Sequence, residues 1–152
     1  MAQALDCLGW EKVFHRIRIG PGKAVGFGWL EEKPVFVLPG GPPSNLMGFL
    51  QIALPGLMAL AGHAQPGLPR INAILAAELA GGKPDWTDFF FGRLEPGEGP
   101  PLFHPLPKRS RLTAIAGATA VAAIPEGRDR LPAGAMLRVQ LLAGAGGLAG
   151  LA

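Results

Sequence analysis

Short runs of alternating or continuously apolar residues, separated by Gly and Pro, dominate the first part of the chain. Val13 to Ile19 alternates apolar and polar residues with period two, as a half-buried strand does. Val25 to Leu30 and Pro34 to Leu38 predict two further strands, joined by the polar turn Glu31-Glu32-Lys33. Val35 to Leu38 is continuously apolar, which is typical of a strand buried on both faces of an α/β sheet.

A helix is predicted directly after the third strand. Ser44 or Asn45 can cap it, and the apolar residues between Leu46 and Leu60 keep roughly helical spacing. Pro55 should kink this helix. The stretch is shorter than a bilayer span and is interrupted by Gln51 and Pro55, which argues against a membrane helix.

The chain also begins with a helical pattern. Ala2 to Leu8 predicts the last turns of a helix that Gly9 closes as a left-handed C-cap residue, and the segment has no N-cap of its own. A helix without a start that passes at once into strands predicts a chain that begins inside a domain. We therefore expect the first half of that domain to be missing.

The periodicity changes beyond residues 63–67, a connector of small residues. The runs that follow are short, apolar or alternating, and separated by Gly and Pro: Ile71 to Leu79, Phe89 to Leu94, Leu102 to Leu106, Thr119 to Ile124 and Met136 to Leu142. Strands at this interval predict a small all-β barrel or sandwich. The expected organisation is an α/β partial domain over 1–62, a linker over 63–67, an all-β domain over 68–142 and a disordered Gly/Ala/Leu tail over 143–152.

Composition narrows the classes of function. The chain has 152 residues, of which 49% are hydrophobic, so it can build one ordinary core or two small ones. Its net charge is +3, and the basic residues are scattered apart from Lys108-Arg109-Ser110-Arg111, which favours an anionic small molecule over nucleic acid. The one cysteine, Cys7, cannot form an intramolecular disulfide and no leader-like segment precedes it, so the cytoplasm is expected. The three histidines show no metal-ligand spacing, and no zinc site is expected.

Two turns are candidates for anion binding. Residues 38–44, Leu-Pro-Gly-Gly-Pro-Pro-Ser, join a strand to a helix, which gathers backbone N–H groups at the positive end of the helix dipole. Residues 20–23, Gly-Pro-Gly-Lys, form a second tight turn whose lysine could lie beside the first. Arg16 and Arg18 share one face of their predicted strand and could line the same site. Each feature has a plain alternative, namely a connecting loop, a turn with a solvated lysine and an exposed polar face.

Two other groups of residues, an aromatic cluster and a pair of carboxylates, are explained better by structure than by ligand binding or catalysis. Trp86 and the three phenylalanines at 89–91 could stack on a planar ring, but core packing explains them better. Asp85 and Asp88 lie near each other without defining a magnesium site or an acid/base pair.

In their order along the chain, these motifs resemble the C-terminal part of the molybdopterin molybdenumtransferases, the family of the bacterial MoeA proteins and the gephyrin E domain. The family carries a Lys-Pro-Gly-Lys-Pro turn, then Phe-Gly, then a strand running into Leu-Pro-Gly-Asn-Pro-Val-Ser and a helix. A later Ile-Pro-Glu-Gly turn precedes its last strand. The matching segments are residues 20–24, Phe27-Gly28, residues 38–44 and residues 124–127.

The resemblance implies the C-terminal half of a molybdopterin-binding-like three-layer α/β/α domain followed by a small β domain. It implies a transferase that inserts molybdate into adenylylated molybdopterin with release of AMP, helped by Mg²⁺, in a homodimer. It assigns substrate or anion binding to Arg16, Lys23, Pro39, Gly40, Gly41, Pro42, Ser44 and Thr113. No catalytic residue and no metal ligand is assigned.

Several family positions differ in this sequence. Gly20, Ala24 and Gly41 replace a lysine, a proline and an asparagine of the two turns. Phe91 stands where the family has an arginine, and Ala114 replaces one of two serines. The family's Gly-Gly-x-Ser-x-Gly-x-x-Asp motif and its two N-terminal domains are absent, so we do not expect this chain to turn over alone. Two alternatives stay open: a catalytically silent binding or protein-interaction module on the same fold, and an unrelated small α/β plus β-barrel protein.

Overall fold

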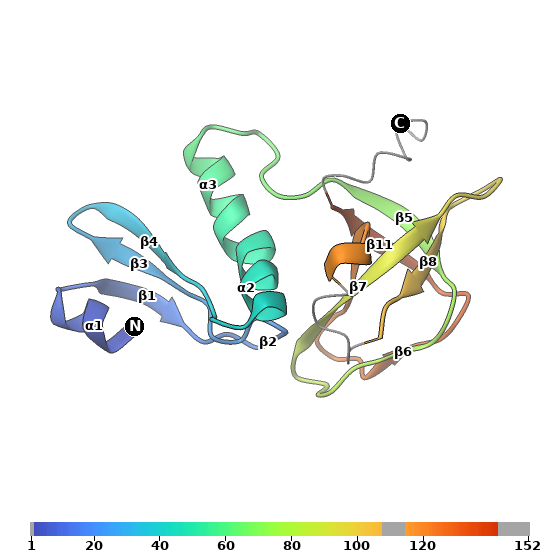
Figure 1. The fold of residues 1–152 in the computed structure, drawn as a ribbon, viewed down its shortest axis with the longest axis horizontal. Coiled ribbons are helices and arrows are strands. Elements are labelled where there is room, and N and C mark those ends of the chain that lie inside the picture. The colour runs from blue at the N-terminus through green and yellow to red at the C-terminus, as the bar shows by residue number, and fades with distance from the viewer. Residues whose placement is uncertain (1, 108–114, 143–152) are drawn as a thin grey trace. The chain divides into compact units, whose positions relative to one another are not determined.

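The computed structural model describes residues 2–107 and 115–142 of the chain. These residues form two compact units, Met1–Gly67 and Leu68–Ala152, each with its own sheet (Figure 1). Thr113, Ala114, the basic residues at 108–111 and the predicted tail at 143–152 lie outside the described residues.

The first unit combines a small antiparallel sheet with one long helix (Figure 1). Its elements are α1 (Ala2–Cys7), β1 (Glu11–His15), β2 (Ile19–Gly20), β3 (Gly26–Leu30), β4 (Lys33–Val37), α2 (Pro42–Gly48), the π-helical turn η1 (Phe49–Ala53) and α3 (Leu54–Leu60). The order β1-β3-β4 places Phe27 of β3 opposite both Phe14 and Phe36. Since α2, η1 and α3 follow without a gap, they form one helix over residues 42–60.

The first strand of the structure, β1, ends earlier than the alternation of apolar and polar residues predicts. Alternation continues to Ile19, but β1 ends at His15 because Arg16 adopts a left-handed φ of 67°. The N–H of Arg16 donates to the carbonyl of Val25, and that of Ile17 donates to the carbonyl of Lys23, so residues 16–25 close into a loop. The prediction that Arg16 and Arg18 share one strand face is therefore wrong.

The residues before the first strand and the last strand of the sheet, β4, can also be compared with the predictions. Gly9 has a φ of 83°, and the N–H of Trp10 donates to the carbonyl of Leu5, which confirms the left-handed end of the first helix. In β4, Val37 is buried but Val35 and Phe36 are only half-buried. Val35 and Phe36 point to opposite faces of the sheet, so the burial on both faces that the continuous apolar run predicts is not reached in the described structure.

The helix begins at a different residue from the one predicted, and it continues past Pro55. Its N-cap is Gly41, not Ser44 or Asn45, since two prolines occupy the first helical positions. Pro55 does not end the helix, because the π-helical turn lies directly before it and the N–H of Leu54 bonds the carbonyl of Phe49. With 19 residues the helix is longer than the sequence pattern suggested.

By length and composition alone, the helix at residues 42–60 is long and apolar enough to cross a membrane, and it is the one such helix in the described part of the chain. Core helices of globular proteins pass the same test, so this is weak evidence for a membrane span.

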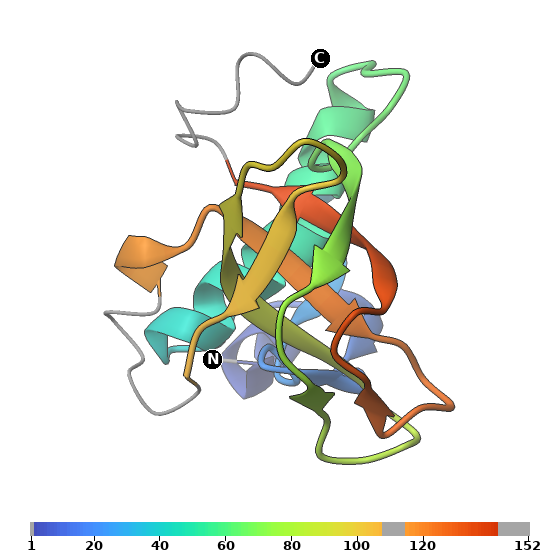
Figure 2. The same ribbon diagram turned by 90° about the vertical axis from the view of Figure 1, so that its right-hand side faces the viewer.

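The second unit is a closed barrel (Figure 2). Its strands are β5 (Arg70–Leu75), β6 (Leu79–Ala80), β7 (Thr87–Glu95), β8 (Leu102–Pro105), β9 (Ala120–Ile124), β10 (Arg130–Leu131) and β11 (Met136–Leu141). The order β7-β8-β5-β11-β9 closes because β9 also pairs with β7, whereas β6 and β10 pair with each other outside the barrel sheet. Of the two predicted β architectures, the barrel is observed.

The barrel interior combines large and small side chains. Phe103 is fully buried, and its ring lies so close to Gly92 that a Cβ at that position would overlap it. Ala73, Ala120 and Ala122 leave the space that Phe90 and Phe103 fill. Phe90 therefore belongs to the core, as the sequence suggested for the aromatic cluster.

Candidate anion-binding site

The two predicted anion turns meet at the start of the long helix, and the point where they meet is Gly48. A Cβ built on Gly48 would lie 3.3 Å from Cδ of Pro39 and 3.5 Å from Cβ of Val25. A Cβ built on Gly22 would lie 3.4 Å from the backbone nitrogen of Gly48. Two turns separated by two strands in sequence therefore pack against the same helical residue, which has no side chain to keep them apart.

The turn at residues 20–23 has a fixed shape. The Gly20–Pro21 peptide bond is cis, and Gly22 has a φ of 118°, a backbone conformation that favours glycine. Lys23 follows and is exposed, while its carbonyl accepts the N–H of Ile17. Lys23 thus directly follows the glycine by which this turn packs against Gly48 of the helix.

The turn at residues 38–44 offers fewer donors than its outline suggests. Pro42 and Pro43, the first two residues of α2, have no N–H, and the N–H of Asn45 already bonds the carbonyl of Gly41. The donors that the turn can direct at an anion are therefore those of Gly40, Gly41 and Ser44. Gly40 and Gly41 are exposed, and no atom lies within 4 Å of a Cβ built on either, so the backbone is open to a ligand.

The side chain of Asn45, not that of Ser44, contacts the backbone of this turn. Ser44 lies half-buried in the first turn of the helix and is not its N-cap residue. Asn45 instead turns back, and its Nδ2 donates to the carbonyl of Pro39 at 2.9 Å. This bond ties the start of the helix to the end of the strand and holds the turn closed.

The charge around both turns is positive. Arg16, Arg18 and Lys23 lie in the loop at 16–25, where all three are exposed. The sequence has no Asp or Glu between residues 16 and 30 or between residues 33 and 77. The sequence around the turns therefore carries more basic than acidic residues, which favours an anion over a cation as the ligand.

The barrel supplies different groups from those the sequence suggested. Phe91 is buried, and Arg93 lies two residues further along β7, on the same side of the strand. Nε of Arg93 donates to the carbonyl of Gly117 at 2.8 Å. The period-two spacing from Phe91 could have revealed this arginine, which our sequence analysis missed.

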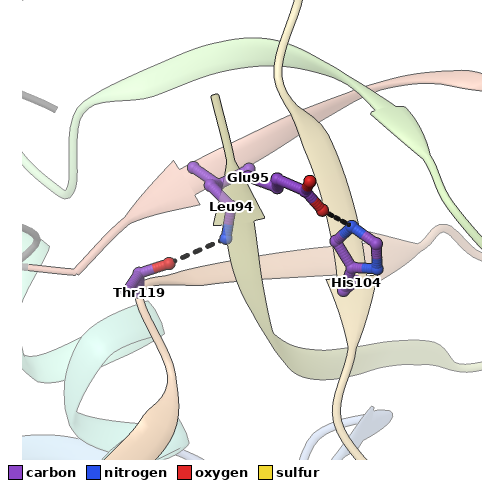
Figure 3. Close-up of polar contacts among 4 residues, drawn as sticks. All are labelled: Leu94, Glu95, His104 and Thr119. Carbon is purple, nitrogen blue, oxygen red and sulfur yellow. Dashed lines mark hydrogen bonds and ion pairs between the residues drawn. The ribbon is translucent and has the colours of Figure 1, made fainter. Parts of the chain in front are cut away.

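Neighbouring polar groups of the barrel have structural partners. Oγ1 of Thr119 accepts the backbone N–H of Leu94 at 2.9 Å, and Nε2 of His104 lies 2.7 Å from Oε2 of Glu95 on the adjacent strand (Figure 3). These contacts join strands β7, β8 and β9 at one side of the barrel. They account for the polar side chains there without a ligand.

Metal ligands are not gathered in the described part of the chain. Within residues 2–107 and 115–142, no three His, Cys, Asp or Glu side chains are grouped so that they could hold an ion. Asp88, one of the two predicted neighbouring carboxylates, accepts the backbone N–H of Gly82 and so closes a turn. The described residues therefore do not fit a magnesium site of their own.

The known proteins to which this chain is similar in sequence or structure are all named for molybdopterin. The molybdopterin molybdenumtransferase of Synechococcus elongatus is 31% identical over 144 residues, covering 91% of this chain and 34% of that protein. Molybdopterin molybdenumtransferase 2 of Mycobacterium tuberculosis is 29% identical over 126 residues, covering 83% and 31%. A crystal structure of the molybdopterin biosynthesis MoeA protein from Pyrococcus horikoshii matches with a TM-score of 0.77 and 30% identity, covering 92% of this chain and 34% of that one. No family model matches.

The chain is related to the C-terminal part of the molybdopterin molybdenumtransferases. It spans about a third of the length of these relatives. A second Pyrococcus horikoshii MoeA structure, with a TM-score of 0.73 and 23% identity, shares the fold.

Comparison with the MoeA family motif shows which hydrogen-bond donors differ in the turn at residues 38–44. The family motif Leu-Pro-Gly-Asn-Pro-Val-Ser has a valine, with its N–H, where this chain has Pro43. Together with the change to Gly41, this substitution removes one backbone donor and one side-chain amide from the turn. The turn keeps its position between strand and helix but presents fewer groups to a ligand.

Proposed function

We propose that this chain belongs to a protein of molybdenum cofactor biosynthesis that inserts molybdate into adenylylated molybdopterin with release of AMP. The observation that carries the proposal is the packing of the turns at 20–23 and 38–44 against Gly48, next to a loop at 16–25 that carries two arginines and a lysine. Both substrates are anions, and backbone N–H groups with a nearby lysine and arginines suit them.

Each residue of the site has a proposed task. The N–H groups of Gly40, Gly41 and Ser44 would hold an oxyanion, and Lys23 and Arg16 would supply positive charge beside it. Pro39 and Pro42 would stiffen the turn, and Thr113 is a further proposed binding residue, as the family resemblance implies. These assignments remain proposals, because they follow from the family motifs and the geometry of the turns.

Further properties follow from the same resemblance. We propose that the first unit is the C-terminal half of a molybdopterin-binding-like α/β/α domain and that the whole protein is a cytoplasmic homodimer. The resemblance also implies that Mg²⁺ assists the reaction. Since the described residues do not form a site for it, ligands from elsewhere in the assembled protein or from the substrates would have to hold the ion.

The test is molybdate-dependent release of AMP from adenylylated molybdopterin. The chain is assayed alone and joined to the remaining two-thirds of the Synechococcus elongatus relative, which this chain does not match. We expect release only from the joined protein, and about 100-fold less of it in Lys23→Ala. Lys12→Ala removes an exposed lysine outside both turns and should stay within about twofold. The absence of release from the joined protein would refute the proposal.

A second candidate function is a silent binding or interaction module on this fold. The loss of donors at Gly41 and Pro43 and the replacement of an arginine by Phe91 favour it. Isothermal titration with molybdate and with a pterin phosphate separates the two candidates. A retained site should bind at least one of these anions, whereas a silent module should bind neither.

A further inference from the structure

The outer face of the barrel carries an apolar row that crosses strands β11, β5 and β8. In the register of these strands, Met136 lies opposite Ile74, and Ile74 lies opposite Leu102. All three side chains point away from the interior, because the neighbouring residues along each strand belong to the barrel core. Met136 is 59% exposed and Leu102 is 38% exposed. Single exposed apolar residues are ordinary, but adjacent ones form a patch that typically marks a contact with a partner.

Beside this row, the same face carries two exposed arginines, Arg138 of β11 and Arg70 of β5. Each lies opposite an amide residue of the other strand, and neither strand contains an Asp or Glu. On the other side of the row, the carboxylate of Glu95 is already paired with His104 at 2.7 Å. The two arginines occupy diagonal positions of the strand pair, where residues are about 7–8 Å apart. Two like charges this close repel each other, and an anionic group placed between them would relieve the repulsion.

Distances along the strands define the kind of ligand that matches this face. Arg138 lies two residues from Met136, and Arg70 lies four residues from Ile74. At the rise of a strand, the two positive charges are therefore about 7 Å and about 13 Å from the apolar row. In an extended polypeptide, successive side chains on one face are also about 7 Å apart. A segment with one large apolar residue and acidic residues two and four positions later would meet the row and both arginines at once.

We propose that the barrel face formed by β8, β5 and β11 binds an acidic, extended segment of another polypeptide. Its apolar side chain would lie on the row of Met136, Ile74 and Leu102, and its carboxylates would bind the two guanidinium groups of Arg138 and Arg70. Guanidinium groups match carboxylates in a bidentate arrangement, which gives the contact its specificity. Nucleic acid fits this face less well, because β5 and β11 contain no aromatic residue on which bases could stack. The inference does not depend on anion binding in the first unit.

The experiment measures binding of two fluorescent peptides to the whole chain by anisotropy at low salt. The probe peptide, Ser-Phe-Ser-Glu-Ser-Glu-Ser, places its phenylalanine and both glutamates on one face. The control peptide, Ser-Phe-Glu-Ser-Glu-Ser-Ser, has the same composition but places the glutamates on the opposite face. Arg70→Gln with Arg138→Gln removes both charges of the barrel face. Arg128→Gln with Arg130→Gln is the matched control, since these exposed arginines lie in or next to β10, outside the barrel sheet. Circular dichroism checks that both double variants are folded.

We expect the probe peptide to bind with a Kd of about 100 µM or tighter and the control peptide to bind at least about fivefold more weakly. The change at Arg70 and Arg138 should weaken binding of the probe at least about tenfold, and the control pair less than about twofold. The proposal is overturned by no binding up to about 1 mM, by equal binding of the two peptides, or by equal effects of the two double variants. Tighter binding of a single-stranded oligonucleotide would make the face a nucleic-acid surface instead. A dimer of this chain that Arg70→Gln with Arg138→Gln dissociates would make a second copy the occupant.

Discussion

The hairpin between β3 and β4 should become more stable when its two glutamates are replaced by Asn and Gly. Glu31 and Glu32 form a two-residue turn and have positive φ values of 48° and 64°. Such a turn with both central residues in the left-handed region is type I′, which strongly favours Asn-Gly. Left-handed backbone costs an ordinary L-residue about 1–2 kcal/mol, and an adjacent pair of like charges adds a small repulsion.

The gain can be worked from these values. Relief at two positions amounts to about 2–4 kcal/mol, from which about 1 kcal/mol is lost because glycine gives the unfolded chain more freedom. We therefore expect Glu31→Asn with Glu32→Gly to raise the free energy of unfolding of the first unit by about 1–3 kcal/mol. For a unit of this size that corresponds to about 4–24 °C in Tm.

Urea unfolding followed by tryptophan fluorescence is the assay. Trp10 and Trp29 lie in the first unit and Trp86 in the second, so a Trp86→Phe background isolates the wanted signal. The matched control, Glu31→Gln with Glu32→Gln, removes the charges but keeps the backbone strain, and should gain less than about 0.5 kcal/mol. If the glutamine pair stabilises as much as Asn-Gly, charge and not conformation is the cause, and the reasoning fails.

Three further substitutions test the packing of each unit by urea unfolding. Phe103→Ala should cost the barrel about 3–5 kcal/mol, because the fully buried ring packs over Gly92. Gly28→Ala should destabilise the first unit by at least about 3 kcal/mol, since its Cβ would overlap both the indole of Trp10 and the backbone carbonyl of Glu11; a smaller loss would show that the indole and this part of β1 can both move. Asn45→Ala should cost only about 1 kcal/mol, because the lost hydrogen bond to Pro39 is exposed; an unchanged stability would show that this bond does not hold the turn.

Local sequence patterns predicted the elements better than their ends. The strand–turn–helix sequence around Pro39 and the barrel strands follow from apolar runs and from Gly and Pro. The end of β1 does not, because Arg16 leaves the strand only where its N–H bonds Val25, a residue nine positions away. That partner is fixed by tertiary structure, and the local alternation through Ile19 carries no sign of it.

The candidate site likewise combines features that the sequence predicted with features that it could not predict. The order of the motifs identified the family, and two prolines at the helix start could have indicated Gly41 as the N-cap. The meeting of the two turns at Gly48 could not be read from spacing, because it depends on how the sheet places the first turn against the helix. Arg93 was missed because the family pattern directed attention to Phe91 alone.

The π-helical turn at residues 49–53 couples the length of this helix to the proline at position 55, so the two should not change independently in evolution. One additional residue in a turn rotates all that follows by about 100°, so α3 owes its orientation on the sheet to that insertion. Deleting one residue from 49–53 would restore regular α-helical pairing, and the ring of Pro55 would then clash with the carbonyl of the residue four positions before it. Loss of the additional residue alone would therefore be harmful, so descendants of this sequence should lose it only together with the proline.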